Sequence, residues 1–130
     1  FLAGMVKSGV IYGATGDARQ SLVDARDIAA VAAAVLRSPS GHAGRSYTLT
    51  GPEALTDSER AAILSKVLGR PVSFQAVPVE AGDEAMRGMG MPPELVDWLG
   101  SLNRIVSAGY AADLSADVEK LTGRAPTGFA

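Results

Sequence analysis

Two carboxylates three residues apart, Asp24 and Asp27, are the first candidates for chemistry in this sequence of 130 residues. Paired carboxylates in different environments can titrate apart and act as general acid and general base. We favour structural roles for both. Asp27 is predicted to be a structural helix cap, because its carboxylate can accept from first-turn amides and suits the positive end of the helix dipole. Asp24 is predicted to pair with Arg26 or Arg45, and catalytic residues stay unknown.

The only histidine, His42, lies in a glycine-rich polar loop with no acidic neighbour that would orient it. A Ser–His–Asp arrangement therefore has no support in the sequence. One histidine and no cysteine also give no spacing typical of a zinc site, so we expect no metal.

A glycine-containing loop, Gly13-Ala-Thr-Gly16, follows a short apolar run and imitates the opening of a dinucleotide-binding fold. The position of the third glycine holds Arg19, and no continuous helix follows. An acidic residue about twenty positions further on, at the end of a second strand, is also lacking. We interpret the segment as a connecting loop.

Three methionines, Met86, Met89 and Met91, alternate with Gly82, Gly88 and Gly90. Glycine gives the backbone freedom, and methionine makes deformable apolar contacts. Two interpretations stay open, a wall of an apolar ligand pocket and ordinary core packing. On the first, the segment from residue 82 to residue 92 acts as a lid or adjustable pocket wall.

Composition narrows the classes of function. A net charge of −2, with 12 basic residues scattered singly, provides no positive stripe for nucleic acid. No apolar run approaches the ~20 residues that cross a bilayer. With no cysteine and 47% apolar residues, we expect one cytoplasmic globular domain with no membrane or nucleic-acid partner.

Apolar periodicity and turn residues predict an alternation of strands and helices. Thr56 and Glu59 have the spacing of a capping box, and Gly69 is placed to end the helix that follows. Such alternation favours parallel strands joined by crossovers, hence an α/β fold. The predicted strands are 9–12, 45–50 and 72–76, and the predicted helices are 28–37, 56–68, 80–91, 93–108 and 115–121.

Four segments carry a resemblance to a known family: 21–34, 42–53, 68–71 and 119–126. Together they resemble the NmrA-like branch of the atypical (extended) short-chain dehydrogenase/reductase family, which binds NAD(P). There the first segment, Ser-Leu-Val-Asp-Ala-Arg-Asp-Ile-Ala-Ala in this chain, lies past the middle of a longer polypeptide. The resemblance implies a C-terminal fragment: the last part of a Rossmann-type doubly wound sheet plus a smaller, mostly helical substrate-side lobe. Residues 1–52 would end the nucleotide-binding domain, and 53–130 would form the lobe.

The resemblance also implies a function. The complete protein would be an oxidoreductase that uses NAD or NADP to reduce a quinone or other small carbonyl compound, and the fragment alone would bind no cofactor and be inactive. The alternative is a non-catalytic, NAD(P)-sensing regulatory protein that acts through a protein partner. Tyr12, Tyr47 and Tyr110 lack the lysine four residues later that accompanies the family's catalytic tyrosine.

The family places a variable loop beside the substrate pocket at the position of Tyr12 and Gly13. Our substrate-pocket candidates are therefore these two residues together with Met86, Met89 and Met91. The expected partners are a small-molecule substrate and either the missing N-terminal half or a second copy. Such association would use an exposed sheet edge.

Overall fold

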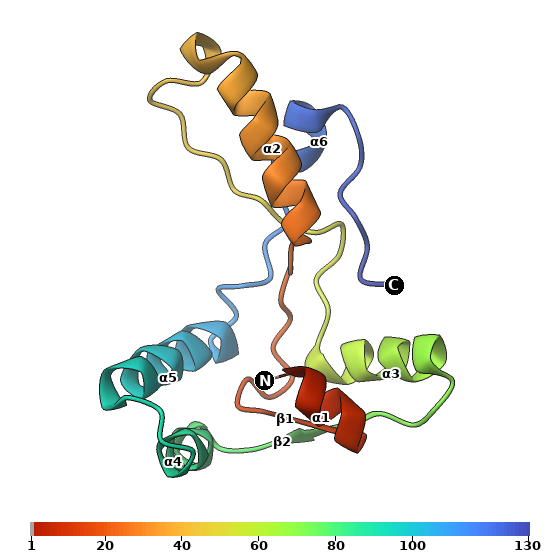
Figure 1. Ribbon diagram of the computed structural model, residues 1–130, viewed down its shortest axis with the longest axis vertical. Helices are drawn as coiled ribbons and strands as arrows, with labels where there is room; N and C mark the ends of the chain where they lie inside the picture. Colours follow the sequence, from red (N-terminus) through yellow and green to blue (C-terminus); the bar gives the residue numbers. More distant parts are fainter. Residues whose placement is uncertain (1) are drawn as a thin grey trace. The chain divides into compact units, whose positions relative to one another are not determined.

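The computed structural model describes residues 2–130, which form two compact units interleaved in sequence (Figure 1). Unit 1 comprises residues 2–20, 55–112 and 130, and unit 2 comprises residues 21–54 and 113–129. The predicted boundary between residues 52 and 53 lies within a unit 2 segment. The assignment of 1–52 to a nucleotide-binding domain and of 53–130 to a substrate-side lobe stays a prediction.

Unit 1 is built on two parallel strands, β1 (Val10–Gly13) and β2 (Ser73–Ala76). Val10 pairs with Ser73 and Gly13 with Ala76. The parallel pairing predicted from the strand–helix alternation is confirmed. Two helices pack on these strands, α1 (Leu2–Ser8) against β1 and α3 (Asp57–Leu68) against β2. The core between them is made of Ile11, Ala61 and Val72, with Met5, Val6, Leu64 and Phe74 packed around it.

The predicted capping box forms at the start of α3. Thr56 Oγ1 accepts from the Glu59 amide at 3.1 Å, and the Glu59 carboxylate accepts from the Thr56 amide at 2.8 Å. The Thr56 amide, and then the Arg19 guanidinium paired with the same carboxylate at 2.8 Å, hold the pKa of Glu59 below its usual value. Gly69 ends the helix in the left-handed conformation, as predicted, with φ of 63°. Both ends of α3 are therefore set by local sequence.

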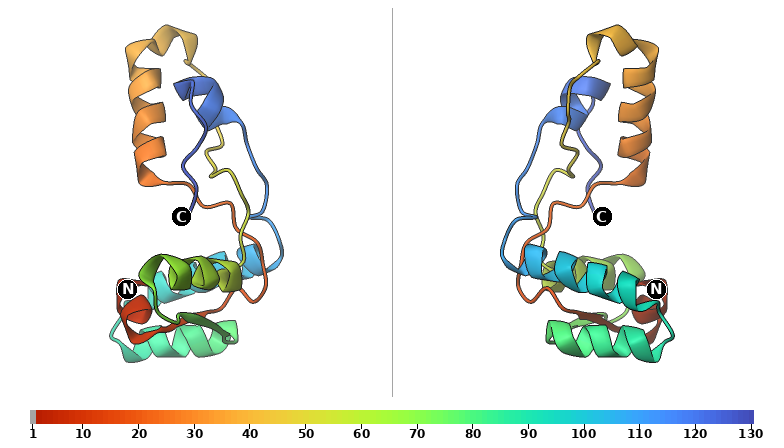
Figure 2. Two further views of the ribbon diagram at one scale, coloured as in Figure 1. Left: turned by 90° about the vertical axis from the view of Figure 1, so that its right-hand side faces the viewer. Right: turned by 90° about the vertical axis from the view of Figure 1, so that its left-hand side faces the viewer.

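Two helices of unit 1 lie side by side, α4 (Val79–Gly88) and α5 (Pro93–Ser107) (Figures 1 and 2). Val96 of α5 is fully buried, and the Asp83 side chain of α4 is almost fully buried. A Cβ on Gly100 would lie 2.8 Å from both carboxylate oxygens of Asp83, which is closer than such atoms can pack. Most of the predicted lid is thus the helix α4, and a short turn with Gly90 at φ of 80° joins α4 to α5.

Two glycines at this turn should respond oppositely to alanine. Gly88 ends α4 without positive φ and has open space where a Cβ would be. Gly88→Ala should therefore stabilise the fold by about 0.5 kcal/mol, because alanine lowers the conformational entropy of the unfolded chain. Gly90→Ala should destabilise it by about 1–2 kcal/mol, because an L side chain is strained in the left-handed region. Urea denaturation of the two variants measures both. Equal effects of the two changes would contradict the described turn.

Unit 2 contains α2 (Ala25–Arg37), the 3₁₀ helix η1 (Pro39–Gly41) and α6 (Asp117–Thr122). Helices α2 and α6 pack together, with Val31 and Val118 buried on them (Figure 2). The prediction of a strand over residues 45–50 was wrong, because this segment pairs with no strand in the part of the chain described.

The segment is held by the start of α6 instead of by a sheet. The Thr48 amide donates to the Asp117 carboxylate at 3.0 Å, and Thr50 Oγ1 accepts from the Ser115 amide at 3.0 Å. The Asp117 side chain therefore satisfies the Thr48 amide, a backbone group that a neighbouring strand would otherwise satisfy. Ser115, which directly precedes the N-cap Ala116 of α6, accepts from the Asp117 amide at 3.1 Å through its hydroxyl.

Candidate functional site

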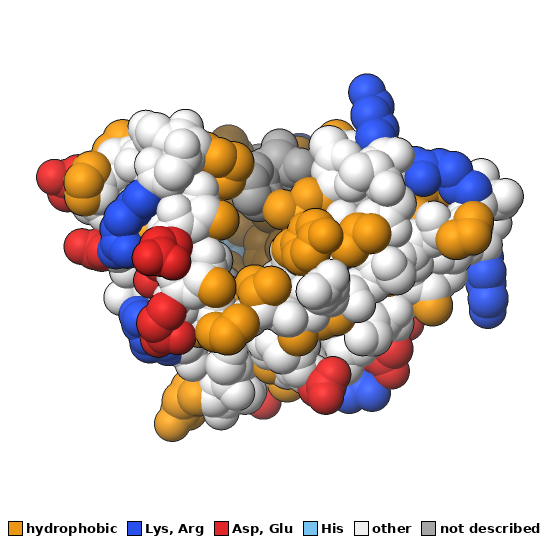
Figure 3. Space-filling model, turned by 90° about the horizontal axis from the view of Figure 1, so that it is seen from below, with side chains coloured by type: hydrophobic (Ala, Val, Ile, Leu, Met, Phe, Trp, Pro, Cys, Tyr) orange, Lys and Arg blue, Asp and Glu red, His pale blue; other side chains and the backbone are white. Residues whose placement is uncertain are grey.

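A cavity of about 640 Å³ opens in unit 1, and its wall is mostly apolar. The five predicted pocket residues, Tyr12, Gly13, Met86, Met89 and Met91, all line it. Met5 lines it too, so the cavity wall holds all four methionines of the sequence. Seen from below, hydrophobic side chains gather around a hollow on this face (Figure 3). The structure thus brings together residues from β1, α4 and the turn after α4.

Gly13 is placed on this wall by the end of β1. A Cβ there would lie 2.8 Å from Phe74 Cε2 and 3.3 Å from Asp57 Oδ2. The absence of a side chain at this position therefore lets Phe74 and Asp57 approach the strand end. The chain after Gly16 runs without a helix until Ala25, which agrees with the interpretation of residues 13–16 as a connecting loop.

A polar cluster interrupts the apolar wall, formed by Thr15, Asp57 and Arg60. Thr15 is buried and donates from Oγ1 to Asp57 Oδ2 at 2.6 Å. Arg60 Nη2 donates to the other carboxylate oxygen, Oδ1. Sequence reasoning missed this cluster. The only signal in the sequence was the spacing of three residues between Asp57 and Arg60, which places the two side chains next to each other on a helix. Thr15 lies 42 residues from Asp57, so no local pattern predicts their contact.

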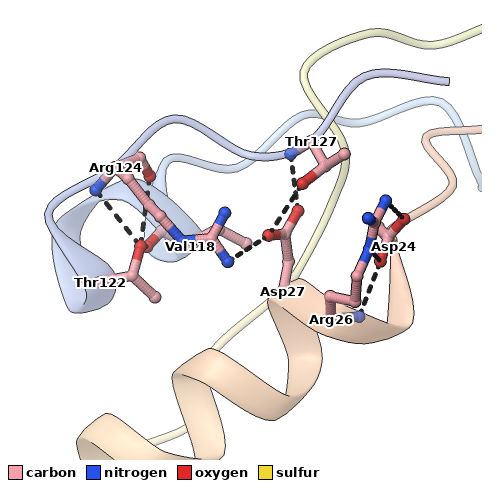
Figure 4. A network of polar contacts seen from close by, with 7 residues as sticks. All are labelled: Asp24, Arg26, Asp27, Val118, Thr122, Arg124 and Thr127. Carbon is pink, nitrogen blue, oxygen red and sulfur yellow. Dashed lines mark hydrogen bonds and ion pairs between the residues drawn. The ribbon is translucent and has the colours of Figure 1, made fainter. Parts of the chain in front are cut away.

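The prediction that Asp27 caps a helix was wrong. The helix begins at Ala25, and its cap is Asp24, whose carboxylate accepts from the Arg26 amide at 2.7 Å (Figure 4). Asp24 also forms an ion pair with the Arg26 guanidinium at 2.8 Å, and Arg26 was one of its two predicted partners. This guanidinium lowers the pKa of Asp24 to about 2.

Asp27 is fully buried within unit 2 and holds the tail of the chain. Its carboxylate accepts from the Thr127 amide at 2.6 Å and from the Thr127 hydroxyl at 3.2 Å, and it pairs with Arg124 at 2.8 Å (Figure 4). The Thr127 amide is the main cause that holds the pKa of Asp27 below its usual value. Neither Asp24 nor Asp27 lines the cavity.

His42 does have a neighbour, although not an acidic one. Its Nδ1 lies 2.7 Å from the Tyr47 hydroxyl, and the two rings meet edge to face. No carboxylate completes a triad in the described hydrogen bonds of either residue. Across residues 2–130, no three side chains among histidine, cysteine, aspartate and glutamate are grouped as metal ligands. None of the helices in this range combines the length and apolar character that a membrane span needs.

Comparison with known proteins gives several relatives but no match to a protein-family model. The chain is 43% identical over 124 residues to an NAD(P)H azoreductase of Xenophilus azovorans, covering 95% of this chain and 43% of the relative. It is 42% identical over 121 residues to the (4-alkanoyl-5-oxo-2,5-dihydrofuran-3-yl)methyl phosphate reductase of Streptomyces griseus, covering 93% and 42%.

Among solved structures, the chain resembles the NADPH-dependent quinone oxidoreductase of Escherichia coli in its complex with NADPH. The TM-score is 0.86 at 33% identity, over 98% of this chain and 45% of that one. The chain therefore spans less than half the length of the curated relatives it matches. Its fold is α/β and corresponds to part of a Rossmann-type, NAD(P)-binding reductase.

Proposed function

We propose that this chain is the substrate-side part of an NAD(P)H-dependent reductase that acts on a quinone or other small carbonyl compound. One observation carries the proposal. An apolar cavity of about 640 Å³, within the ~300–1,000 Å³ usual for small-molecule sites, lies in a chain that matches an NADPH-dependent quinone oxidoreductase at a TM-score of 0.86. Because the three similar proteins are named as reductases or as an oxidoreductase, we propose catalysis in preference to a regulatory role.

The substrate contacts in this proposal are Tyr12 and Gly13 of β1 together with Met86, Met89 and Met91, which all line the cavity wall. Methionine side chains deform easily, so this wall can adjust to aromatic or alicyclic molecules of different outline. The lid role of residues 82–92 belongs to the same proposal. Movement there would take place at the α4–α5 turn, where the left-handed Gly90 lies.

The nucleotide is proposed to bind outside this chain. The residues present do not fit a dinucleotide, because the pyrophosphate requires a glycine-rich turn that leads directly into a helix N-terminus. The loop after Gly13 leads to none. We propose that the remainder of a longer protein, or a second copy, covers apolar side chains that α5 exposes, Trp98 and Ile105 among them.

A chimera tests this function. Residues 1–130 replace the matching 45% of the Escherichia coli quinone oxidoreductase, and NADPH oxidation by 1,4-naphthoquinone is followed by absorbance. We expect the chimera to turn over the quinone. The isolated chain, as control, should give no saturable NADPH binding below about 1 mM, because it lacks the phosphate-binding turn. A folded chimera that binds NADPH without reducing the quinone would contradict the proposal, as would micromolar NADPH binding by the chain alone.

A further inference from the structure

The guanidinium of Arg60 has donors left over at the cavity wall. Its side chain is 12% exposed, and among residues 2–130 it donates through Nη2 to Asp57 alone. The Nε–H is buried and has no acceptor in the part of the chain described. Buried donors in native proteins almost always have a partner, so an unsatisfied one beside a cavity calls for an explanation. Because Nε has almost no exposed surface, a small movement of the Arg60 side chain on binding would bring this donor to an acceptor atom of a bound molecule.

The charge of Arg60 is already balanced. Asp57 accepts from Arg60 through Oδ1 and from the buried Thr15 hydroxyl through Oδ2, so the carboxylate is fixed from both sides. Among the described residues that line the cavity, Asp57 and Arg60 are the only charged ones, and their charges sum to zero. The wall therefore offers hydrogen-bond donors without a net positive charge.

This balance selects between two kinds of acceptor. An anionic group would lose its hydration against an apolar wall and would have to compete with Asp57 for the guanidinium. A neutral carbonyl oxygen loses much less hydration and adds no charge. It also accepts a stronger hydrogen bond from a guanidinium than from a neutral donor.

We propose that Arg60 determines specificity in this cavity by donating to the oxygen of a neutral, largely apolar carbonyl compound, with Asp57 and Thr15 as its positioning residues. The inference rests on the proposed function, whose cavity it uses, and narrows the substrate class to uncharged acceptors. Arginine suits this role better than lysine, because its planar fork keeps donors free while one nitrogen binds the carboxylate.

Binding to the 130-residue chain without nucleotide tests the proposal, with 1,4-naphthoquinone, naphthalene and 1-naphthyl phosphate as probes. The ¹³C-methyl signals of methionine report occupancy directly, since all four methionines line the cavity. The absence of cysteine prevents thiol addition to the quinone. We expect the quinone to bind about tenfold tighter than either other probe, in keeping with a hydrogen bond to a charged group.

Three variants separate a binding role from a structural one. Arg60→Met should lower quinone affinity about tenfold, to that of naphthalene, by removing every donor. Arg60→Lys keeps the ion pair with Asp57 and serves if the methionine variant misfolds; it should also lose the preference for the quinone. Asp57→Asn frees the positive charge and should raise 1-naphthyl phosphate affinity about tenfold.

The outcomes distinguish this inference from the proposed function. Unchanged quinone affinity in both Arg60 variants overturns the inference, as does tighter binding of the phosphate than of the quinone to the unmodified chain. Failure of all three probes to shift the methionine signals also overturns it. A chimera that reduces the quinone alongside any of these results would leave the reductase function standing and remove only the role of Arg60.

Discussion

We expect the substitution Asp27→Asn to release the carboxyl-terminal tail of unit 2. The buried carboxylate binds the Thr127 amide and hydroxyl and pairs with Arg124, so three groups depend on one side chain. An asparagine oxygen can still accept from one of them, but its NH₂ group then faces other donors. We expect a lower melting temperature and fast hydrogen exchange of the Thr127 amide.

The matched control is the same change at Asp24, the actual cap of α2. Asparagine caps helices nearly as well as aspartate, so Asp24→Asn should keep the melting temperature and leave the Thr127 amide protected. If the two variants behaved alike, or if only Asp24→Asn lowered the melting temperature, the reassignment of the cap from Asp27 to Asp24 would be wrong.

The hold of Asp27 on the tail should depend on pH in a definite direction. Its pKa is lowered in the folded chain, so the folded state favours the charged carboxylate. The stabilisation is therefore complete above the unfolded pKa of about 3.9 and is lost as pH falls through the lower folded value. Exchange of the Thr127 amide should report this loss under acid conditions. Asp27→Asn should show no such transition.

Local sequence was enough to predict much of the fold. The capping box of Thr56 and Glu59, the left-handed Gly69 and the parallel pairing of β1 with β2 each follow from a few neighbouring residues or from element order. Such signals survive because caps and turns are satisfied mainly by the groups beside them. Met86, Met89 and Met91, which lie close together in the sequence, all line the cavity, and their contact with a substrate stays a prediction.

Contacts between distant segments account for the errors. In the sequence Asp27 resembles a helix cap, but in the structure its carboxylate accepts from the Thr127 amide, 100 residues away. The alternation in residues 45–50 is typical of a strand, yet the α6 start binds this segment through Asp117 and Ser115. The polar cluster on the cavity wall depends on Thr15 meeting Asp57. Spacing along the chain contains no information about such partners.

The contact between α4 and α5 gives the other large expected effect. Gly100→Ala should destabilise unit 1 by about 1–3 kcal/mol, the usual cost of overpacking. The added methyl group would lie 2.8 Å from both oxygens of the buried Asp83 carboxylate, and α5 would have to move away from α4. Urea denaturation of the variant measures the change in the free energy of unfolding.

Asp83→Ala removes the obstacle and turns the measurement into a double-mutant cycle. Asp83 Oδ1 has no hydrogen-bond partner in the part of the chain that the structure describes, and Oδ2 lies 3.8 Å from Arg104 Nη2, so Asp83→Ala alone should cost little stability. In that background Gly100→Ala should stabilise the chain by about 0.5–1 kcal/mol, because alanine replaces glycine inside a helix. The sign of the Gly100→Ala effect therefore reverses when Asp83 is absent. An equal loss in both backgrounds would mean that the carboxylate is not what fills the space beside Gly100.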